Sequence, residues 1–232
     1  MRTDRVSVLL LSLAVYIGCD AENKSTTDKS QGNDSATHSH ADPAPWQLSP
    51  VDSLSQIPGG TSHAELAERY GKEELLEGES YMGEGETAPA TILFPDDPTR
   101  HMEIVWSDPQ TRSGVERITV RGEKSNWYVL PGITLGTTLD SLVRLNGKPI
   151  TFYGFDWDYG GTIADWNGGR LAEMESQERR VLLRLGYDHR AYETLSEKER
   201  GEISGDRKIG SEDPAVRKAG ISVREILVVK AP

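Results

Sequence analysis

The segment with the most chemical potential is residues 155–161, which read Phe-Asp-Trp-Asp-Tyr-Gly-Gly. Asp156 and Asp158 place two carboxylates two positions apart, with a glycine at the sixth position, as in calcium-binding loops. A loop of that type also needs an acidic ligand at its twelfth position, where this chain has Asn167. The sequence therefore rejects the regular calcium loop. A calcium site completed irregularly by Asp165 stays open, and we otherwise expect no metal and no cofactor.

The same segment also suits the recognition of a partner. Trp157 and Tyr159 carry the ring types that anchor interfaces, and the flanking aspartates and glycines favour a turn that displays them. Rings and carboxylates also suit the stacking and hydroxyl contacts of a sugar. We therefore predict a binding site at Asp156, Trp157, Asp158 and Tyr159 for a protein or a glycan. In the alternative interpretation, the segment is a hairpin in which Trp157 and Tyr159 pack on one face.

Motifs of catalysis are missing from the sequence. It contains no Gly-x-Ser-x-Gly elbow, no His-Glu-x-x-His and no phosphate-binding loop. His63, His101 and His189 stand far apart in the chain, which favours surface or partly packed histidines over a general base. Carboxylates such as Asp156 and Asp165 leave one catalytic alternative, a hydrolase of envelope polymers. We expect no catalytic residue and keep that hydrolase as the second hypothesis.

The N-terminus has the layout of a secretory signal. Arg2 and Arg5 precede an apolar run over residues 6–17, which is shorter than the roughly 20 residues that span a bilayer. The run is followed by Gly and Cys19, and this ending resembles the lipobox of bacterial lipoproteins, although Tyr16 stands where leucine is usual. The resemblance implies diacylation of Cys19. An ordinary cleaved signal that includes Cys19 is the alternative.

Cleavage before Cys19 divides the chain into a signal peptide, residues 1–18, and a mature lipoprotein. Residues 19–45 then form a disordered tether, because residues 20–45 contain no Leu, Ile, Val, Phe, Trp, Tyr or Met to bury. We expect a lipid-anchored protein of the bacterial cell envelope that faces the periplasm or the exterior, on either membrane. The net charge of −11 argues against nucleic acid as a partner, because phosphates bind Lys and Arg.

An internal repeat organises the remaining chain. Residues 57–78 and 133–154 share Ile, Gly, Thr, Leu, Gly, Lys and Gly in register, at an offset of 76 residues. A repeat of this kind indicates one supersecondary unit per copy. Each copy is expected to begin with a short helix, the first capped by Ser62 and ending at Gly71, the second ending at Gly147.

Segments typical of strands follow both predicted helices. We expect strands at residues 90–94, 102–106, 115–120, 126–130, 150–155, 162–166, 181–185 and 223–229. A charged helix around residues 191–201 and a loop precede the last strand. These elements predict an α+β fold, mainly antiparallel sheet with short helices on one side. Two related helix-then-strands units would cover residues 46–125 and 126–232, the second with a C-terminal extension.

A longer phrase carries a family resemblance. The sequence Pro-Gly-Ile-Thr-Leu-Gly-Thr-Thr-Leu-Asp-Ser-Leu at 131–142, then Asn-Gly-Lys-Pro at 146–149, resembles the helix-plus-sheet repeat of two envelope groups. They are the small lipoproteins of the β-barrel assembly machinery and the β-lactamase inhibitor proteins. The resemblance covers residues 131–171 and, weakly, 57–106, and the chain looks closer still to uncharacterised bacterial envelope lipoproteins. It implies a noncatalytic binding or scaffolding role.

Overall fold

The computed structural model describes residues 47–48, 57–129, 132–174 and 179–231. The chain divides at residues 41 and 42, and every described element belongs to the second unit, Asp42–Pro232. The predicted signal peptide, the tether and the lipidation residue Cys19 lie outside the described residues. Those three features therefore stay predictions.

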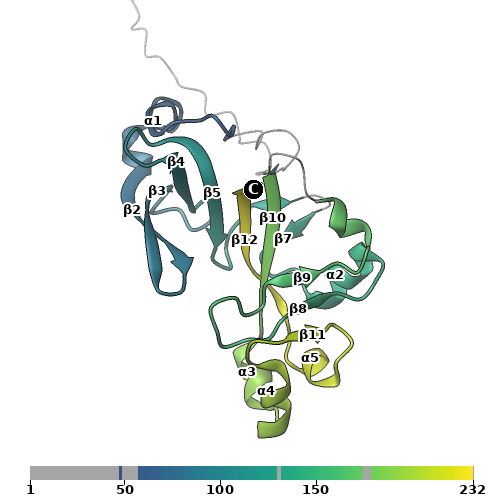
Figure 1. Cartoon of the computed structure of the whole chain (residues 1–232). Helices are drawn as coiled ribbons and strands as arrows, with labels where there is room; N and C mark the ends of the chain where they lie inside the picture. The colour runs from purple at the N-terminus through teal and green to yellow at the C-terminus, as the bar shows by residue number, and fades with distance from the viewer. Residues whose placement is uncertain (1–46, 49–56, 130–131, 175–178, 232) are drawn as a thin grey trace, which may run out of the picture. The chain divides into compact units, whose positions relative to one another are not determined.

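A six-stranded sheet is the largest element of the second unit (Figure 1). All of its neighbouring strands pair antiparallel. From one edge to the other the strands are β10 (Arg179–Gly186), β12 (Ser222–Lys230), β5 (Ser113–Arg121), β4 (Met102–Asp108), β3 (Glu86–Leu93) and β2 (Leu75–Gly83).

Two three-stranded sheets complete the strands. The first consists of β1 (Gln47–Leu48), β6 (Tyr128–Val129) and β7 (Ile133–Thr134), with β1 and β6 parallel. The second consists of β11 (Lys208–Gly210), β8 (Thr151–Tyr153) and β9 (Ile163–Asp165). A bridge between Thr162 and Arg184 joins this second sheet to β10.

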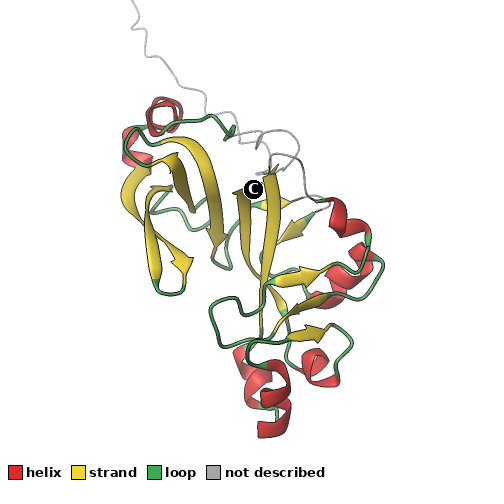
Figure 2. Cartoon of the chain, viewed as in Figure 1, coloured by secondary structure: helices red, strands yellow, loops and turns green. Residues whose placement is uncertain are grey.

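The helices are short and lie between the strands in sequence (Figure 2). They are α1 (His63–Tyr70), η1 (Lys72–Glu74), α2 (Leu139–Asn146), η2 (Arg170–Glu173), α3 (His189–Glu193), α4 (Glu197–Ile203) and α5 (Pro214–Lys218). Ser62 and Glu65 form a capping box at the start of α1, while Thr138 caps α2. Gly147 ends α2 in the left-handed conformation that favours glycine.

The two faces of the six-stranded sheet differ in polarity. Ile104 and Ile118 lie opposite each other on β4 and β5, and both are fully buried in the main apolar core. Their neighbours Glu103 and Thr119 also pair across β4 and β5. Because successive side chains of a strand point to opposite faces, this second pair lies on the other face of the sheet.

The structure confirms the α+β fold and most of the predicted elements. The sequence did not predict β2, whose nine residues are mostly exposed, or the short elements β1, β7, η1 and η2. The loop expected before the last strand contains β11 and the helix α5. The single helix expected around residues 191–201 is two helices, α3 and α4. Strands from both predicted units share one sheet, since β5 pairs with β12.

Candidate functional site

The four binding residues predicted from the sequence lie in one loop, residues 154–162, between β8 and β9. Asp156, Asp158 and Tyr159 are exposed, whereas Trp157 is only half-exposed. The loop is fixed to the sheet because the backbone N–H of Leu185 on β10 donates a hydrogen bond of 2.8 Å to the carbonyl of Gly161. The geometry therefore brings the predicted residues together, but it does not present them equally to solvent.

Trp157 is held inside its own loop. Its indole Nε1–H donates to the carbonyl of Gly154 at 2.8 Å. The ring makes edge-to-face contacts with Tyr153, with ring centroids 5.7 Å apart, and with Tyr159, at 5.3 Å. A buried indole generally needs such a partner for its N–H. These contacts favour the packing interpretation for Trp157, whose ring packs against that of Tyr159.

Asp156 also holds the loop in shape. Its φ is 68°, a left-handed conformation that Asp tolerates better than most residues. Its carboxylate accepts hydrogen bonds from the hydroxyls of Ser204 at 2.7 Å, Tyr187 at 3.1 Å and Tyr192 at 3.4 Å. Tyr187 and Tyr192 stack with centroids 4.1 Å apart. Burial raises the pKa of Tyr187 above its usual value, and the hydrogen bond to Asp156 raises it further by a smaller amount.

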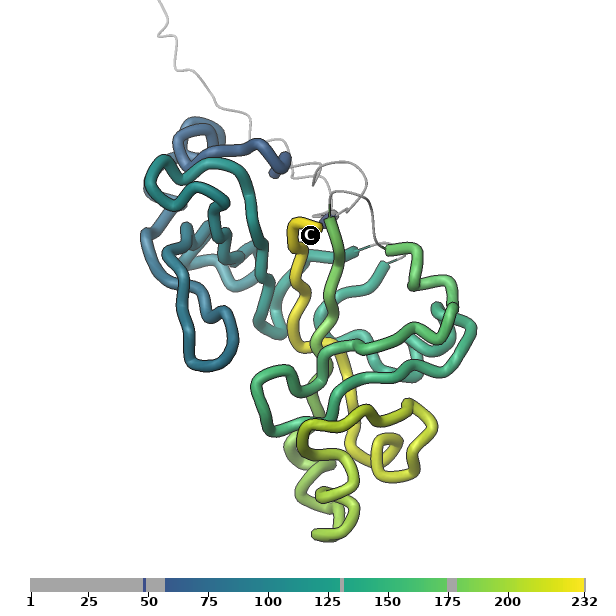
Figure 3. The backbone as a smooth tube through the Cα atoms, in the orientation of Figure 1, coloured from purple at the N-terminus to yellow at the C-terminus, as the bar shows by residue number. Residues whose placement is uncertain are grey.

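The loop meets the hairpin formed by β2 and β3, more than seventy residues earlier in the chain (Figure 3). Tyr81 donates its hydroxyl to Asp158 Oδ1 at 2.9 Å. Tyr159 donates its hydroxyl to Glu84 Oε1 at 2.8 Å. The hydrogen bond to Glu84 raises the pKa of the exposed Tyr159 phenol. Two reciprocal contacts thus tie the hairpin to the loop.

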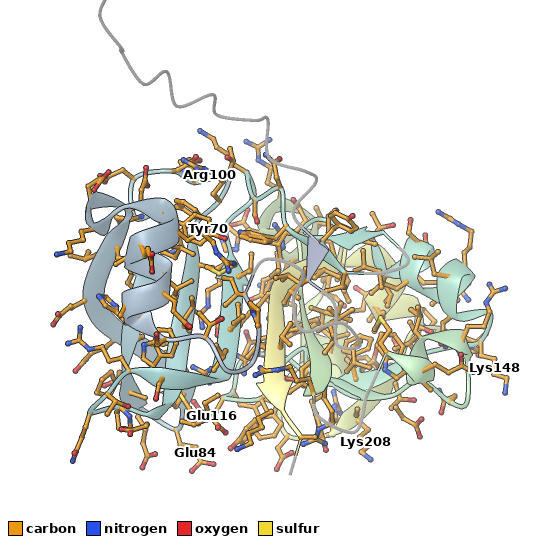
Figure 4. All side chains as sticks on the ribbon, turned by 90° about the horizontal axis from the view of Figure 1, so that it is seen from above. Tyr70, Glu84, Arg100, Glu116, Lys148 and Lys208 are labelled. Carbon is orange, nitrogen blue, oxygen red and sulfur yellow. The ribbon has the colours of Figure 1, made fainter. Side chains whose placement is uncertain are left out.

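The tip of this hairpin is a two-residue turn. Glu84 and Gly85 both have positive φ, 53° and 78°, as the turn type favoured by antiparallel hairpins requires. The backbone N–H of Gly85 reaches the Tyr81 hydroxyl at 3.3 Å. Glu84 lies at the margin of the molecule when the side chains are viewed from above (Figure 4).

Exposed apolar side chains concentrate where the hairpin and the loop meet. Among the described residues, four large hydrophobic side chains are exposed, and three of them are Tyr81 (40%), Met82 (40%) and Tyr159 (44%). Tyr81 hydrogen-bonds Asp158, and Tyr159 hydrogen-bonds Glu84. We call the set Tyr81, Met82, Glu84, Asp158 and Tyr159 the hairpin–loop surface. It offers apolar rings beside carboxylates, a combination suited to binding.

A charged network on the polar face of the sheet contacts the backbone of both the loop and the hairpin. Arg121 on β5 contacts Glu103 and donates to Glu225 Oε1 at 2.9 Å, and Arg184 lies 3.5 Å from Glu225 Oε2. Arg184 also donates to the backbone carbonyl of Asp158. We call Glu103, Arg117, Arg121, Arg184 and Glu225 the sheet network. It connects the loop to four strands of the sheet, β10, β12, β5 and β4.

Arg117 extends the sheet network to the hairpin. Its Nη2 donates to Ser80 Oγ at 3.0 Å and to the Tyr81 carbonyl at 2.6 Å. Arg117 is on β5 and Tyr81 is on β2, three strands away, which is roughly 14 Å in a flat sheet. That span exceeds the reach of an arginine, so the sheet curls toward its polar face. Burial lowers the pKa of Arg117, and its Nε–H has no hydrogen-bond partner.

Neither the calcium nor the hydrolase hypothesis gains support from the described residues. In that part of the chain, no three His, Cys, Asp or Glu side chains are grouped to hold a metal ion. Three surface hollows of about 290, 210 and 470 Å³ are lined by at most one carboxylate each, Glu123 in the first and Asp140 in the second. A glycoside hydrolase needs two carboxylates facing one substrate.

Sequence reasoning missed the hairpin half of the surface. Tyr81, Met82 and Glu84 fall in or next to β2, a strand that was not predicted. The dipeptide Glu84-Gly85 between two runs of β-forming residues was the available signal for a tight hairpin. Nothing in the sequence signals that this hairpin meets a loop more than seventy residues later.

Comparisons with protein-family models, with curated proteins and with solved structures found no match to this chain. In the described residues, no helix has the length and apolar character needed to cross a bilayer.

Proposed function

We propose that this chain is a lipid-anchored protein of the bacterial cell envelope that binds a partner, without catalysis, through the hairpin–loop surface. The observation that carries the proposal is the convergence of Tyr81, Met82 and Tyr159, three of the four large apolar side chains exposed in the described residues. They come from segments far apart in the chain, and the two tyrosines are held by reciprocal hydrogen bonds. Side chains fixed in this way lose little entropy on binding.

The favoured partner is an envelope protein. Tyr and Met are enriched at the centres of protein interfaces, and the tyrosines here are oriented by Asp158 and Glu84. Residues 75–93 include four glutamates and no Lys, Arg or His, and one of the four, Glu77, pairs with Arg112 at 2.6 Å. The partner should therefore be basic near Glu79, Glu84 and Glu86. A cell-wall glycan that stacks on Tyr159 is the other class of partner predicted from the sequence.

The membrane anchor is a separate part of the proposal. It is supported by the leader of residues 1–18 and by Cys19 directly after it, the single cysteine of the chain. Cys19→Ser should abolish labelling by radioactive palmitate and leave the precursor uncleaved. Palmitate labelling that survives this substitution would show that the anchor is not at Cys19.

Co-purification from cells tests the binding function. The double variant Met82→Ser with Tyr159→Ala should lose the partner that the unchanged protein retains, because both exposed contacts are removed. Lys148→Ser is the control, since Lys148 is exposed and lies on the side of the molecule away from Glu84 (Figure 4). Equal recovery of partner by the double variant would reject the hairpin–loop surface as the binding site.

A further inference from the structure

Strand β2 forms one edge of the six-stranded sheet and β10 forms the other. The two edges differ in how other described residues cover them. The edge at β10 is covered, because Arg184 bridges to Thr162 and the Leu185 N–H donates to Gly161. No described strand pairs with β2 beyond β3 (Figure 1). β2 is nine residues long, which is long for an unprotected edge.

The β2–β3 register determines which N–H and C=O groups of β2 point away from β3. Phe94 N–H donates to the carbonyl of Glu74 at 2.8 Å, and these two residues stand opposite each other by continuation of the β2–β3 register. Hydrogen-bonded and non-hydrogen-bonded pairs alternate along an antiparallel ladder. Glu77 and Glu79 are therefore in non-hydrogen-bonded pairs, with N–H and C=O groups directed outward. Pro89, which has no N–H, stands opposite Glu79 and agrees with this assignment.

The composition of β2 does not block pairing. Natural proteins protect exposed edges with charged side chains, Pro or a bulge. β2 contains neither Lys nor Pro, and its charged residues, Glu77 and Glu79, oppose a like-charged strand but not a basic one. Its register shift lies at one end only, between Tyr81 and Gly83. At that same end Arg117 occupies the Tyr81 carbonyl. The open stretch is thus centred on Glu77 and Glu79, whose side chains point to the same face two residues apart.

We propose that β2 accepts an added strand from the partner, and that this strand carries Lys or Arg at alternating positions. The inference rests on the proposed function and names the kind of partner segment. An added antiparallel strand places its side chains about 5 Å from those of Glu77 and Glu79. A second copy of β2 would place glutamates opposite glutamates, so like charges disfavour self-pairing. Glu77 already pairs with Arg112 at 2.6 Å, so the charge that a basic segment would meet is that of Glu79, while the outward backbone groups of both residues supply the ladder.

The test uses the full chain and a synthetic peptide, Lys-Val-Lys-Val-Lys-Val-Lys. The peptide should bind and should slow hydrogen exchange at the amides of Glu77 and Glu79. A copy of the peptide N-methylated at alternate residues has the same charge but cannot form the ladder, and it should bind about tenfold more weakly. Binding that leaves the exchange of both amides unchanged would overturn the inference.

Matched variants separate the backbone from the charge. Glu79→Pro removes an outward N–H without removing a hydrogen bond to β3, and should weaken peptide binding about tenfold. Glu79→Gln removes the same charge, keeps the N–H and should retain the exchange protection. Equal binding by the proline variant would refute strand addition. If it is refuted while Met82 and Tyr159 still mediate co-purification, the proposed function stands and only this mode of recognition fails.

Discussion

Gly161 determines how the candidate binding loop docks on the sheet. Its φ is 78°, and a Cβ placed there would lie 2.0 Å from the carbonyl oxygen of Leu185. Only glycine combines that conformation with so close an approach of two backbones. The loop that carries Tyr159 is therefore positioned against β10 by the absence of a side chain.

We expect Gly161→Ala to lower the free energy of unfolding by about 2–4 kcal/mol, because strain and a backbone clash add together. Gly136→Ala is the control. Gly136 has a similar φ of 85° with no atom within 4 Å of an added Cβ, so it should lose only about 1 kcal/mol. Urea unfolding measures both values. Equal losses would show that the contact with Leu185 does not constrain the loop.

Asp156 should control the titration of Tyr187. Burial and the hydrogen bond to Asp156 raise the pKa of Tyr187 above 10.0, so the folded state keeps the phenol proton longer than the unfolded state does. That stabilisation is complete below the ordinary pKa and is lost as the pH rises through the raised pKa. Asp156→Asn should lower the pKa of Tyr187 in an ultraviolet titration of phenolate. An unchanged pKa would contradict the assigned contact.

The β2–β3 hairpin and the loop of residues 154–162 form the site only as a pair. Met82 and Tyr81 come from the hairpin, whereas Asp158 and Tyr159 come from the loop. Neither segment alone carries both an exposed apolar cluster and the groups that orient it. The contact between them is therefore a structural condition for the proposed binding.

A double-mutant cycle on Tyr81→Phe and Asp158→Ala tests that contact. Asp158→Ala removes the acceptor of the 2.9 Å hydrogen bond, and Tyr81→Phe removes its donor together with the acceptor of the 3.3 Å hydrogen bond from Gly85. We expect a coupling free energy of about 0.5–1 kcal/mol for this exposed charged hydrogen bond, measured by urea unfolding. A coupling of zero would mean that the hairpin and loop are not joined in solution.

Across the molecule, the curled sheet brings these distant segments together. Its apolar face packs the core around Ile104 and Ile118, and its polar face carries the sheet network. Arg117 connects β5 to β2, and Arg184 connects β10 to the loop. A charge network buried in this way favours one arrangement of strands, because a slip would leave charges without partners.

Glu225→Gln should lower the free energy of unfolding by about 2–4 kcal/mol, since it leaves Arg121 and Arg184 facing a neutral partner. The side chain of Glu225 is 9% exposed. Glu123 pairs with Arg224 but is 86% exposed, so Glu123→Gln should lose less than about 1 kcal/mol. Similar losses in both variants would argue that the sheet network does not stabilise the fold.

Local patterns predicted much of this fold. The capping box at Ser62 and the glycine end at Gly147 predicted α1 and α2, because these signals act within one turn of chain. β2 escaped prediction because an exposed edge strand shows little apolar alternation. The loop half of the candidate site was predicted from its residue types. The hairpin half depends on the curl of the sheet, which no short pattern encodes.

In-cell photo-crosslinking tests the central claim most directly. A photoreactive side chain would replace Tyr159 in one variant, Lys148 in a second and Trp157 in a third, and mass spectrometry would identify the adducts. Lys148 is exposed and lies on the side of the molecule away from Glu84 (Figure 4). The account predicts a discrete adduct at position 159 and none at position 148 or at the packed position 157. No adduct at position 159 in a correctly anchored protein, or an equal adduct at position 148, would contradict it.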